Sequence, residues 1–231
     1  MAIFAIGDLH LAHGQHKPMD IYGEHWANHV QRLSENWLEA VKKSDLVIVA
    51  GDISWAMQLS EAQPDFDWLA KLPGTKVLIR GNHDYWWSSI SRVRSALPPS
   101  IYALQNDHFT WEVWTICGTR GWICPGEEGF ENDQDQKIYL REVERLRLSL
   151  KSAAEAEAKQ IICALHFPPF NRTNQPSAFS DLLEAYAVTK CVFGHIHDSG
   201  RDQIFQRIRG GVEYLFVAAD GLDFRPKLLV G

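Results

Sequence analysis

The sequence lacks the features of membrane proteins and of strong nucleic-acid binders. No segment of its 231 residues reaches the roughly 18 consecutive apolar residues that a membrane-spanning helix needs. Lysine and arginine number 23 against 29 aspartates and glutamates, which gives a formal net charge of −6 without any basic block. Because tight, non-specific nucleic-acid binding relies on a basic face, we expect no strong nucleic-acid surface and no membrane partner.

The sequence also lacks a targeting signal and is poor in cysteine. Residues 1–6 form a short apolar run without the basic lead of a signal peptide. The four cysteines show no CxxC spacing: Cys163 and Cys191 lie in apolar runs, while Cys117 and Cys124 flank a glycine-containing turn. The sequence therefore predicts a cytoplasmic protein with reduced, mostly buried cysteines rather than disulfides or a structural zinc site.

The apolar content of 45% is enough to bury a sizeable core, and we expect one domain over residues 1–231. Short apolar runs alternate with helix-period segments, which is typical of an α/β architecture. Several of the runs are apolar throughout, as in strands that are covered on both faces. Strands are expected at residues 2–6, 46–50, 76–79, 113–117, 161–165, 190–193, 214–218 and 227–230.

Three helices and three long loops complete the expected organisation. We expect helices over residues 28–43, from a cap at Ser88 to Pro98, and over 136–158, each from its spacing of apolar residues. The loops exceed the usual length of about 4–6 residues. They cover residues 11–27, 118–135 and 168–176. Histidines 13, 16 and 25, in the first loop, are expected at the surface.

Five short polar clusters follow apolar strand candidates. They contain Asp8 and His10, Asp52, Asn82 with His83 and Asp84, His166, and His195 with His197. A single Gly-Asp or histidine at a strand end usually belongs to a turn, but glycine precedes four of these five clusters and permits close backbone approach. Strand ends share one edge of a sheet, so the set indicates a two-metal hydrolytic centre. Mixed oxygen and imidazole ligands suit Mn, Fe, Zn, Co or Ni.

The ordered clusters resemble the motif series of the calcineurin-like metallophosphoesterase superfamily, D-x-H, G-D, G-N-H-[DE], H and G-H-x-H. The resemblance extends from Asp8 to His197. It implies an α/β fold, a four-layer αββα sandwich of two mixed β-sheets flanked by helices. It also implies two divalent or trivalent transition-metal ions, with Mn²⁺ favoured, that lie ~3.5–4 Å apart.

The resemblance further implies a division of the ligand residues. One metal would be held by Asp8, His10 and His197, the other by Asn82, His166 and His195, and both by Asp52. His83 would face the phosphorus centre and stabilise or protonate the leaving oxygen, with a structural histidine as the alternative. Asp84 would orient the His83 imidazole, or else begin the following helix.

Substrate contacts are less specified by the sequence. Arg80 is either a phosphate contact or part of a structural ion pair. Asn171 and Arg172 follow His166 in a proline-rich loop. They are expected either to contact the non-reacting part of a substrate or to belong to an ordinary solvent-exposed loop. Trp55 and Trp86 either pack around the metal centre or form a stacking wall for a flat group.

These residues together predict metal-dependent hydrolysis of a phosphoester by attack of a bridging hydroxide. A compact chain favours a small or exposed substrate, with a slight preference for a phosphodiester because no second phosphate-clamping arginine is evident. Relatives of the resembled superfamily provide the alternatives: a nuclease, a pyrophosphatase of the lipid A pathway, a protein phosphatase, or a non-catalytic interaction module such as the retromer subunit. The residues after Asp52 lack the arginine that the protein phosphatases carry.

Overall fold

The computed structural model describes residues 1–197 and 206–231, and their contacts divide the chain into two compact units. Unit 1 consists of Met1–Ala103 with Val217–Gly231, and unit 2 of Leu104–Phe216. The single domain expected from the sequence stays a prediction. Of the helices in the described residues, none combines the length and apolar character needed to cross a lipid bilayer.

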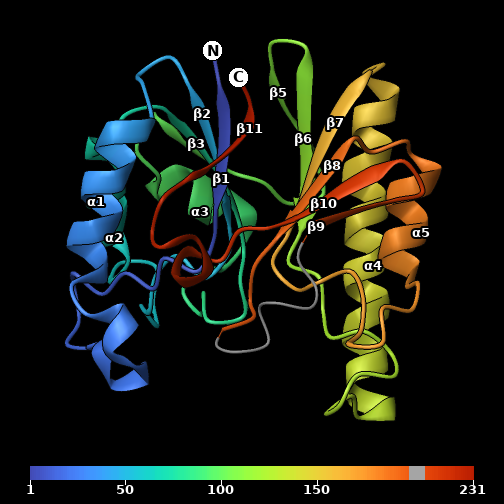
Figure 1. The fold of residues 1–231 in the computed structure, drawn as a ribbon, viewed down its shortest axis with the longest axis horizontal. Coiled ribbons are helices and arrows are strands. Elements are labelled where there is room, and N and C mark those ends of the chain that lie inside the picture. Colours follow the sequence, from blue (N-terminus) through green and yellow to red (C-terminus); the bar gives the residue numbers. More distant parts are fainter. Residues whose placement is uncertain (198–205) are drawn as a thin grey trace. The chain divides into compact units, whose positions relative to one another are not determined.

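Unit 1 contains a five-stranded mixed sheet with the strand order β11-β1-β2-β3-β4 (Figure 1). Four strands are parallel, and β11 is antiparallel to β1. Their bounds are β1 Ile3–Ile6, β2 Leu46–Ala50, β3 Thr75–Ile79, β4 Ile101–Ala103 and β11 Lys227–Val230. The register pairs Ile6 with Val49 and Val49 with Leu78. The carboxyl ends of β1, β2 and β3 therefore lie together at one edge of this sheet.

Helices α1 and α2 cover one face of the unit 1 sheet (Figure 1), and α3 packs beside β4. The helices are α1 His29–Ala40, α2 Gln63–Lys71 and α3 Ile90–Ala96, with short 3₁₀ turns η1 Asp20–Tyr22, η2 Glu24–Trp26 and η4 Ala219–Leu222. Trp37 of α1 and Phe66 of α2 are fully buried in the core that these helices share with β1 and β2. Burial of each such side chain contributes about 1.5–3 kcal/mol.

Unit 2 contains a six-stranded mixed sheet with the order β5-β6-β7-β8-β10-β9. The four central strands are parallel, and the edge strands β5 and β9 are antiparallel to their neighbours. The strands are β5 Phe109–Trp111, β6 Trp114–Thr119, β7 Gln160–Leu165, β8 Lys190–Phe193, β9 Gln206–Arg209 and β10 Val212–Phe216. Helices α4 Asn132–Glu155 and α5 Ala178–Ala185 cover one face of this sheet (Figure 1).

The predicted fold class is confirmed, since the chain forms two mixed sheets flanked by helices. Several predicted boundaries are wrong. The helix expected to begin at Ser88 begins at Ile90, after an N-cap residue, Ser89, whose side chain makes no cap hydrogen bond. The strand expected over 214–218 ends at Phe216, because Ala218 instead bridges to Gly7 in unit 1.

The cysteines are free and buried, as expected from the sequence. The register of unit 2 sets Cys117, Cys163 and Cys191 side by side on β6, β7 and β8. Burial raises the pKa of the Cys163 thiol well above its usual value. Buried thiols of this kind behave as small apolar side chains and are chemically inert.

A buried lysine in unit 1 has a structural role. Lys76 of β3 is fully buried, and its ammonium donates a hydrogen bond to the Leu72 carbonyl just beyond α2. Burial lowers the pKa of Lys76 from 10.5 to about 8. The folded state therefore disfavours the charged form of this side chain relative to the unfolded chain.

The depressed pKa of Lys76 predicts a pH-dependent stability. Between about pH 8 and 10.5 the unfolded chain binds the extra proton, so the free energy of unfolding rises with pH across this window. Below pH 8 the Lys76→Met variant is expected to be more stable than the wild type by up to about 3 kcal/mol. Urea unfolding at a series of pH values measures both effects. The exposed Lys71→Met is the control, and equal pH slopes for wild type and Lys76→Met would refute the assignment.

Candidate metal centre

The loops after β1 and β2 bring three predicted ligands of unit 1 together. Asp8 and His10 donate backbone hydrogen bonds to the carbonyls of Gly51 (2.9 Å) and Asp52 (3.0 Å), so the two loops continue side by side beyond the strands. Asp8, His10 and Asp52 are all buried. A carboxylate oxygen of Asp8 lies within 4.8 Å of a ligand atom of His10 and of Asp52. His10 Nε2 lies 3.9 Å from Asp52 Oδ2.

The backbone at these ligands is left-handed. The φ angles are 56° at Asp8, 47° at His10 and 50° at Asp52, and the loop after β8 adds His195 at 73°. Each left-handed residue with a side chain costs on the order of 1–2 kcal/mol, and such strain concentrates at functional sites. These four predicted ligand positions are among twelve non-glycine residues with positive φ in residues 1–197 and 206–231, so left-handed backbone occurs at the predicted ligands but is not confined to them.

The third loop of unit 1 closes over Asp52. Asp52 Oδ1 accepts a hydrogen bond from the backbone N–H of His83 at 2.8 Å. A Cβ on Gly81 would lie 2.0 Å from Asp52 Oδ1 and 2.2 Å from the Asp52 nitrogen. Only glycine therefore fits between β3 and the Asp52 carboxylate. Asn82 and Arg80, which flank Gly81, are half-buried.

Asp84 joins the second and third loops. It is fully buried, and its Oδ1 accepts hydrogen bonds from Ile53 N (2.9 Å), Ser54 N (3.1 Å) and Trp86 Nε1 (3.0 Å). Its Oδ2 accepts one from Gly81 N at 2.7 Å. Burial, and to a lesser extent the neighbouring Asp52 carboxyl, raise the pKa of Asp84 to about 7. The backbone hydrogen bonds that Asp84 accepts lower its pKa and only partly offset this rise. The contacts give Asp84 a positioning role, while orientation of the His83 imidazole by Asp84 stays a prediction.

Unit 2 brings two further predicted ligands together. His166 follows β7, and its carbonyl accepts a hydrogen bond from Gly194 N after β8 at 3.1 Å. His195 Nδ1 lies 3.2 Å from His166 Nε2. Two imidazole nitrogens bound at about 2.0–2.1 Å to one ion would lie ~2.9–3.4 Å apart at tetrahedral or octahedral angles, so this pair fits a shared metal ion. His197, the last described residue before 206, is half-buried.

The residues expected to contact substrate in unit 2 hold two loops together. Asn171 is buried; its amide donates to the Pro125 carbonyl (3.1 Å), and its oxygen accepts from Gln175 N (3.0 Å). Arg172 pairs through Nε with Glu127 (2.8 Å) and through Nη1 with Glu128 (3.2 Å). These contacts give both residues a structural function, and their contact with substrate stays a prediction.

The aromatic residues near His83 are mostly packed. Trp86 is 1% exposed, and its indole N–H donates a hydrogen bond to Asp84. Trp86 therefore packs around the site and does not form a stacking wall for substrate. The His83 ring lies 4.5 Å from Trp55 and 6.1 Å from Tyr85, measured between ring centroids. Tyr85, which is 52% exposed, is the aromatic residue that solvent reaches here. Lys17 also lies beside these aromatic residues, although the sequence did not predict it as a site residue. Its Nζ lies 3.1 Å from the Trp55 ring centroid.

Comparison with known proteins identifies the chain's family. A family model described as calcineurin-like phosphoesterase matches residues 1–199. The chain belongs to the calcineurin-like phosphoesterase family. The ligand-type residues described above are the candidate metal-binding groups of this family member.

The individual relatives have low sequence identity to this chain or match only a short part of it. The Gene 66 protein of Mycobacterium phage D29 is 39% identical over 85 residues, which are 36% of this chain and 40% of the phage protein. TT1561 of Thermus thermophilus has a TM-score of 0.61 at 12% identity, covering 99% of this chain and 97% of its own. Phosphopantetheinyl hydrolase (PptH) from Mycobacterium tuberculosis has a TM-score of 0.56 at 15% identity, covering 94% and 88%. These two structures share the fold of this phosphoesterase.

The close approach at Gly81 predicts that an alanine substitution at this position impairs activity. Gly81→Ala forces the third loop or the Asp52 carboxylate to move, because the new methyl group would overlap Asp52 Oδ1. Displacement of reacting groups by about 1 Å can cost ~100-fold, and we expect kcat/KM on p-nitrophenyl phosphate to fall by at least this factor. Gly231→Ala, where a Cβ would meet only Leu228 Cδ2 at 3.5 Å, is the control. Wild-type activity and metal content in Gly81→Ala would contradict the geometry.

The hydrogen bonds accepted by Asp84 predict that replacing its carboxylate changes the stability of the protein. Asp84→Asn replaces one acceptor oxygen by an NH₂ group, which leaves buried N–H donors without an acceptor. Near pH 4, where the raised pKa keeps Asp84 protonated, we expect the metal-free variant to lose about 1–3 kcal/mol of unfolding free energy. This loss should shrink as the pH rises towards 7, because the uncharged Asn avoids the desolvation and the Asp52 repulsion that the ionised Asp84 carboxylate experiences. Urea unfolding measures this loss, with the exposed Asp67→Asn as control. Equal stability of Asp84→Asn and wild type near pH 4 would show that the carboxylate does not hold the loops.

Proposed function

We propose that this phosphoesterase hydrolyses a small phosphoester at a dinuclear transition-metal centre. The ligands would be Asp8, His10 and His197 for one ion, Asn82, His166 and His195 for the other, and Asp52 for both. The supporting observation is that left-handed backbone coincides with four of these motif positions. Mn²⁺ is the favoured metal, among Mn, Fe, Zn, Co and Ni.

The chemistry divides between the metal ions and the protein. When bound, the ions supply Lewis-acid activation of water and of the phosphate oxygens. Asp52 keeps its position through the His83 N–H, and Asp84 keeps the two loops in register. His83, packed against Trp55 and 5.8 Å from the His10 ring, would transfer a proton from its imidazole to the leaving-group oxygen.

The proposal extends to substrate and location. A phosphodiester is slightly preferred over a monoester, and the partner is a small molecule rather than nucleic acid or a membrane, given the formal charge of −6. A cytoplasmic location is part of the proposal, supported by four free and buried cysteines that suit a reducing compartment.

An activity screen with a histidine variant tests the proposed function. The protein loaded with each of the five metals is assayed on p-nitrophenyl phosphate, bis-p-nitrophenyl phosphate and 2′,3′-cyclic nucleotides. We expect turnover with Mn²⁺, and a fall in kcat of about 10²–10⁴-fold in His83→Ala because a proton donor is lost. The metal content of this variant should match the wild type, and His108→Ala, which alters a hydrogen bond to Ser152, is the control.

One outcome of this screen would reject the proposed hydrolysis, and another would reject only the role of His83. The absence of turnover with all five metals, with His83→Ala indistinguishable from wild type, would support a non-catalytic interaction module instead. Full activity in His83→Ala would preserve the hydrolase but remove the assigned proton donor.

A further inference from the structure

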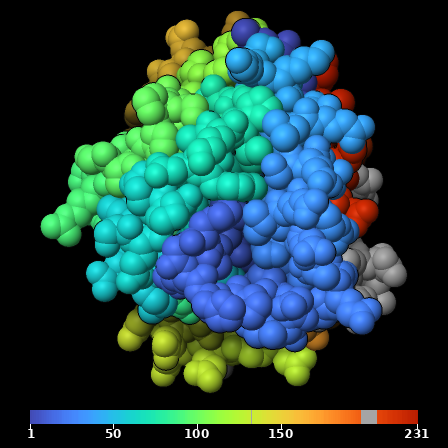
Figure 2. All heavy atoms as spheres, turned by 90° about the vertical axis from the view of Figure 1, so that its left-hand side faces the viewer, coloured from blue at the N-terminus to red at the C-terminus, as the bar shows by residue number. Residues whose placement is uncertain are grey.

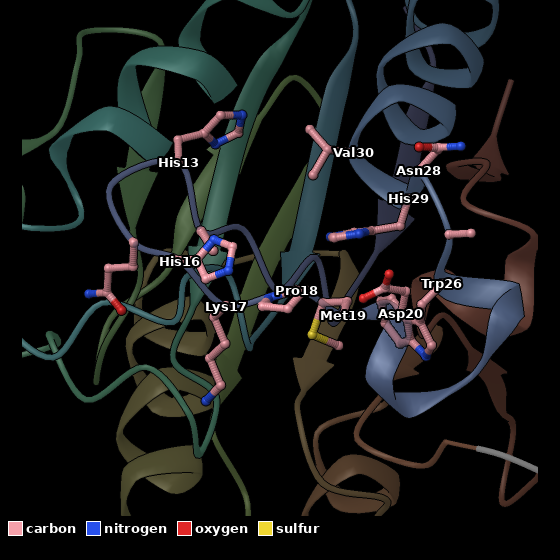
Figure 3. A pocket seen from close by; sticks show the side chains of 13 residues that line it. His13, His16, Lys17, Pro18, Met19, Asp20, Trp26, Asn28, His29 and Val30 are labelled. Carbon is pink, nitrogen blue, oxygen red and sulfur yellow. The ribbon is translucent and has the colours of Figure 1, made fainter.

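The long loop between β1 and α1 lines an open, solvent-facing cavity in unit 1. Its segment lies at the surface beside α1, in dark blue in Figure 2. The cavity measures about 480 Å³, within the range of ~300–1,000 Å³ for small-molecule sites. Figure 3 shows polar side chains on its walls, from the loop and from the start of α1. They include His16, Lys17, Asp20, Asn28 and His29.

Lys17 in this wall is a cation without an acidic partner among the described residues. It is half-buried, and its Nζ lies 3.1 Å from the ring centroid of Trp55. No carboxylate in the described part of the chain forms an ion pair with it. Asp20 is an exposed acidic residue that lines the same cavity, and it forms no ion pair with Lys17 in the described part of the chain. Two acidic residues linked to this loop have other partners: Asp65 accepts hydrogen bonds from His13 N (2.8 Å) and Ser54, and Glu61 from Met57 N (3.0 Å). Desolvation lowers the pKa of Lys17.

Trp55 connects Lys17 to the candidate site. Its indole is stacked on His10 at 4.8 Å and tilted against His83 at 4.5 Å, between ring centroids. Its Nε1 lies 3.2 Å from Met19 Sδ, which holds the indole against the same loop. One aromatic side chain thus separates the Lys17 ammonium from a predicted metal ligand and from the proposed proton donor.

We infer that Lys17 anchors a second anionic group, a phosphate carried by the non-reacting part of the substrate, which lies in the cavity of the β1–α1 loop. This inference rests on the proposed function and narrows its substrate to small phosphoesters with two phosphate groups. A lysine ammonium binds phosphate as a point charge, and the cation–π contact positions it without neutralising it. The imidazole and amide groups of His16, His29 and Asn28 suit a polar group rather than an acyl chain.

A pair of matched ligands tests the inference without relying on turnover. Binding of thymidine 5′-phosphate and thymidine 3′,5′-bisphosphate to the manganese-loaded protein is measured by calorimetry. We expect the wild type to bind the bisphosphate at least about tenfold more tightly, because only this ligand can reach Lys17 with its second phosphate. Lys17→Met keeps the aliphatic stem on Trp55 and should lose most of this ratio, whereas Lys17→Arg should retain it.

The same ratio is then measured in catalysis. The substrates are thymidine 5′-(p-nitrophenyl phosphate) and its 3′-phosphorylated form, which have the same reacting diester and leaving group. The ratio of their kcat/KM values should fall about tenfold in Lys17→Met. It should remain unchanged in Lys43→Met, an exposed lysine near the start of β2. Thermal unfolding of each variant confirms that it is folded.

The outcomes separate this inference from the proposed function. Equal binding of the two ligands by the wild type, or an unchanged ratio in Lys17→Met, would overturn the role of Lys17 and leave it as packing for Trp55. A bisphosphate preference that depends on Lys17, in a protein that hydrolyses no ester, would support the anion site while rejecting the hydrolytic function.

Discussion

The position of the Asp52 carboxylate organises unit 1. The Asp52 backbone carbonyl accepts the His10 N–H, its Oδ1 accepts the His83 N–H, and it lies where Gly81 has no side chain. Asp84 holds the second and third loops together through hydrogen bonds from Ile53 and Gly81. The left-handed backbone at Asp52 is stable only because these contacts over-determine it. Loss of any one contact therefore disturbs all three loops.

Most of the parallel strands, but not β4 at Ile101–Ala103, could be predicted from the sequence. The ligand positions could be predicted as well, because apolar β-forming runs end directly in the motifs. Asp8, His10 and Asp52 do gather in unit 1, and His166 and His195 gather in unit 2. The short antiparallel edge strand β5 was not predictable, since the β5–β6 turn places Glu112 at a φ of 54° where glycine or asparagine would normally give the signal.

Side-chain partners were less predictable than strand positions, because they depend on distant parts of the chain. Asp84 is a sequence neighbour of His83, yet its carboxylate accepts hydrogen bonds from residues 53 and 54. Asn171 and Arg172 lie shortly after His166, but they bind residues 125–128. Lys17 lies in a loop without any periodic signal, and only the fold brings it onto Trp55. The ligand-type motifs can thus be recognised locally in the sequence, whereas the contacts of the neighbouring side chains depend on long-range packing.

Asp52 is proposed to bridge two metal ions. Anomalous diffraction from crystals of the manganese-loaded protein tests it most directly. Two manganese peaks ~3.5–4 Å apart are predicted, each with an Asp52 oxygen as ligand, and with His166 and His195 on the ion opposite to that of Asp8 and His10. A single ion, or ions that do not contact Asp52, would contradict the account.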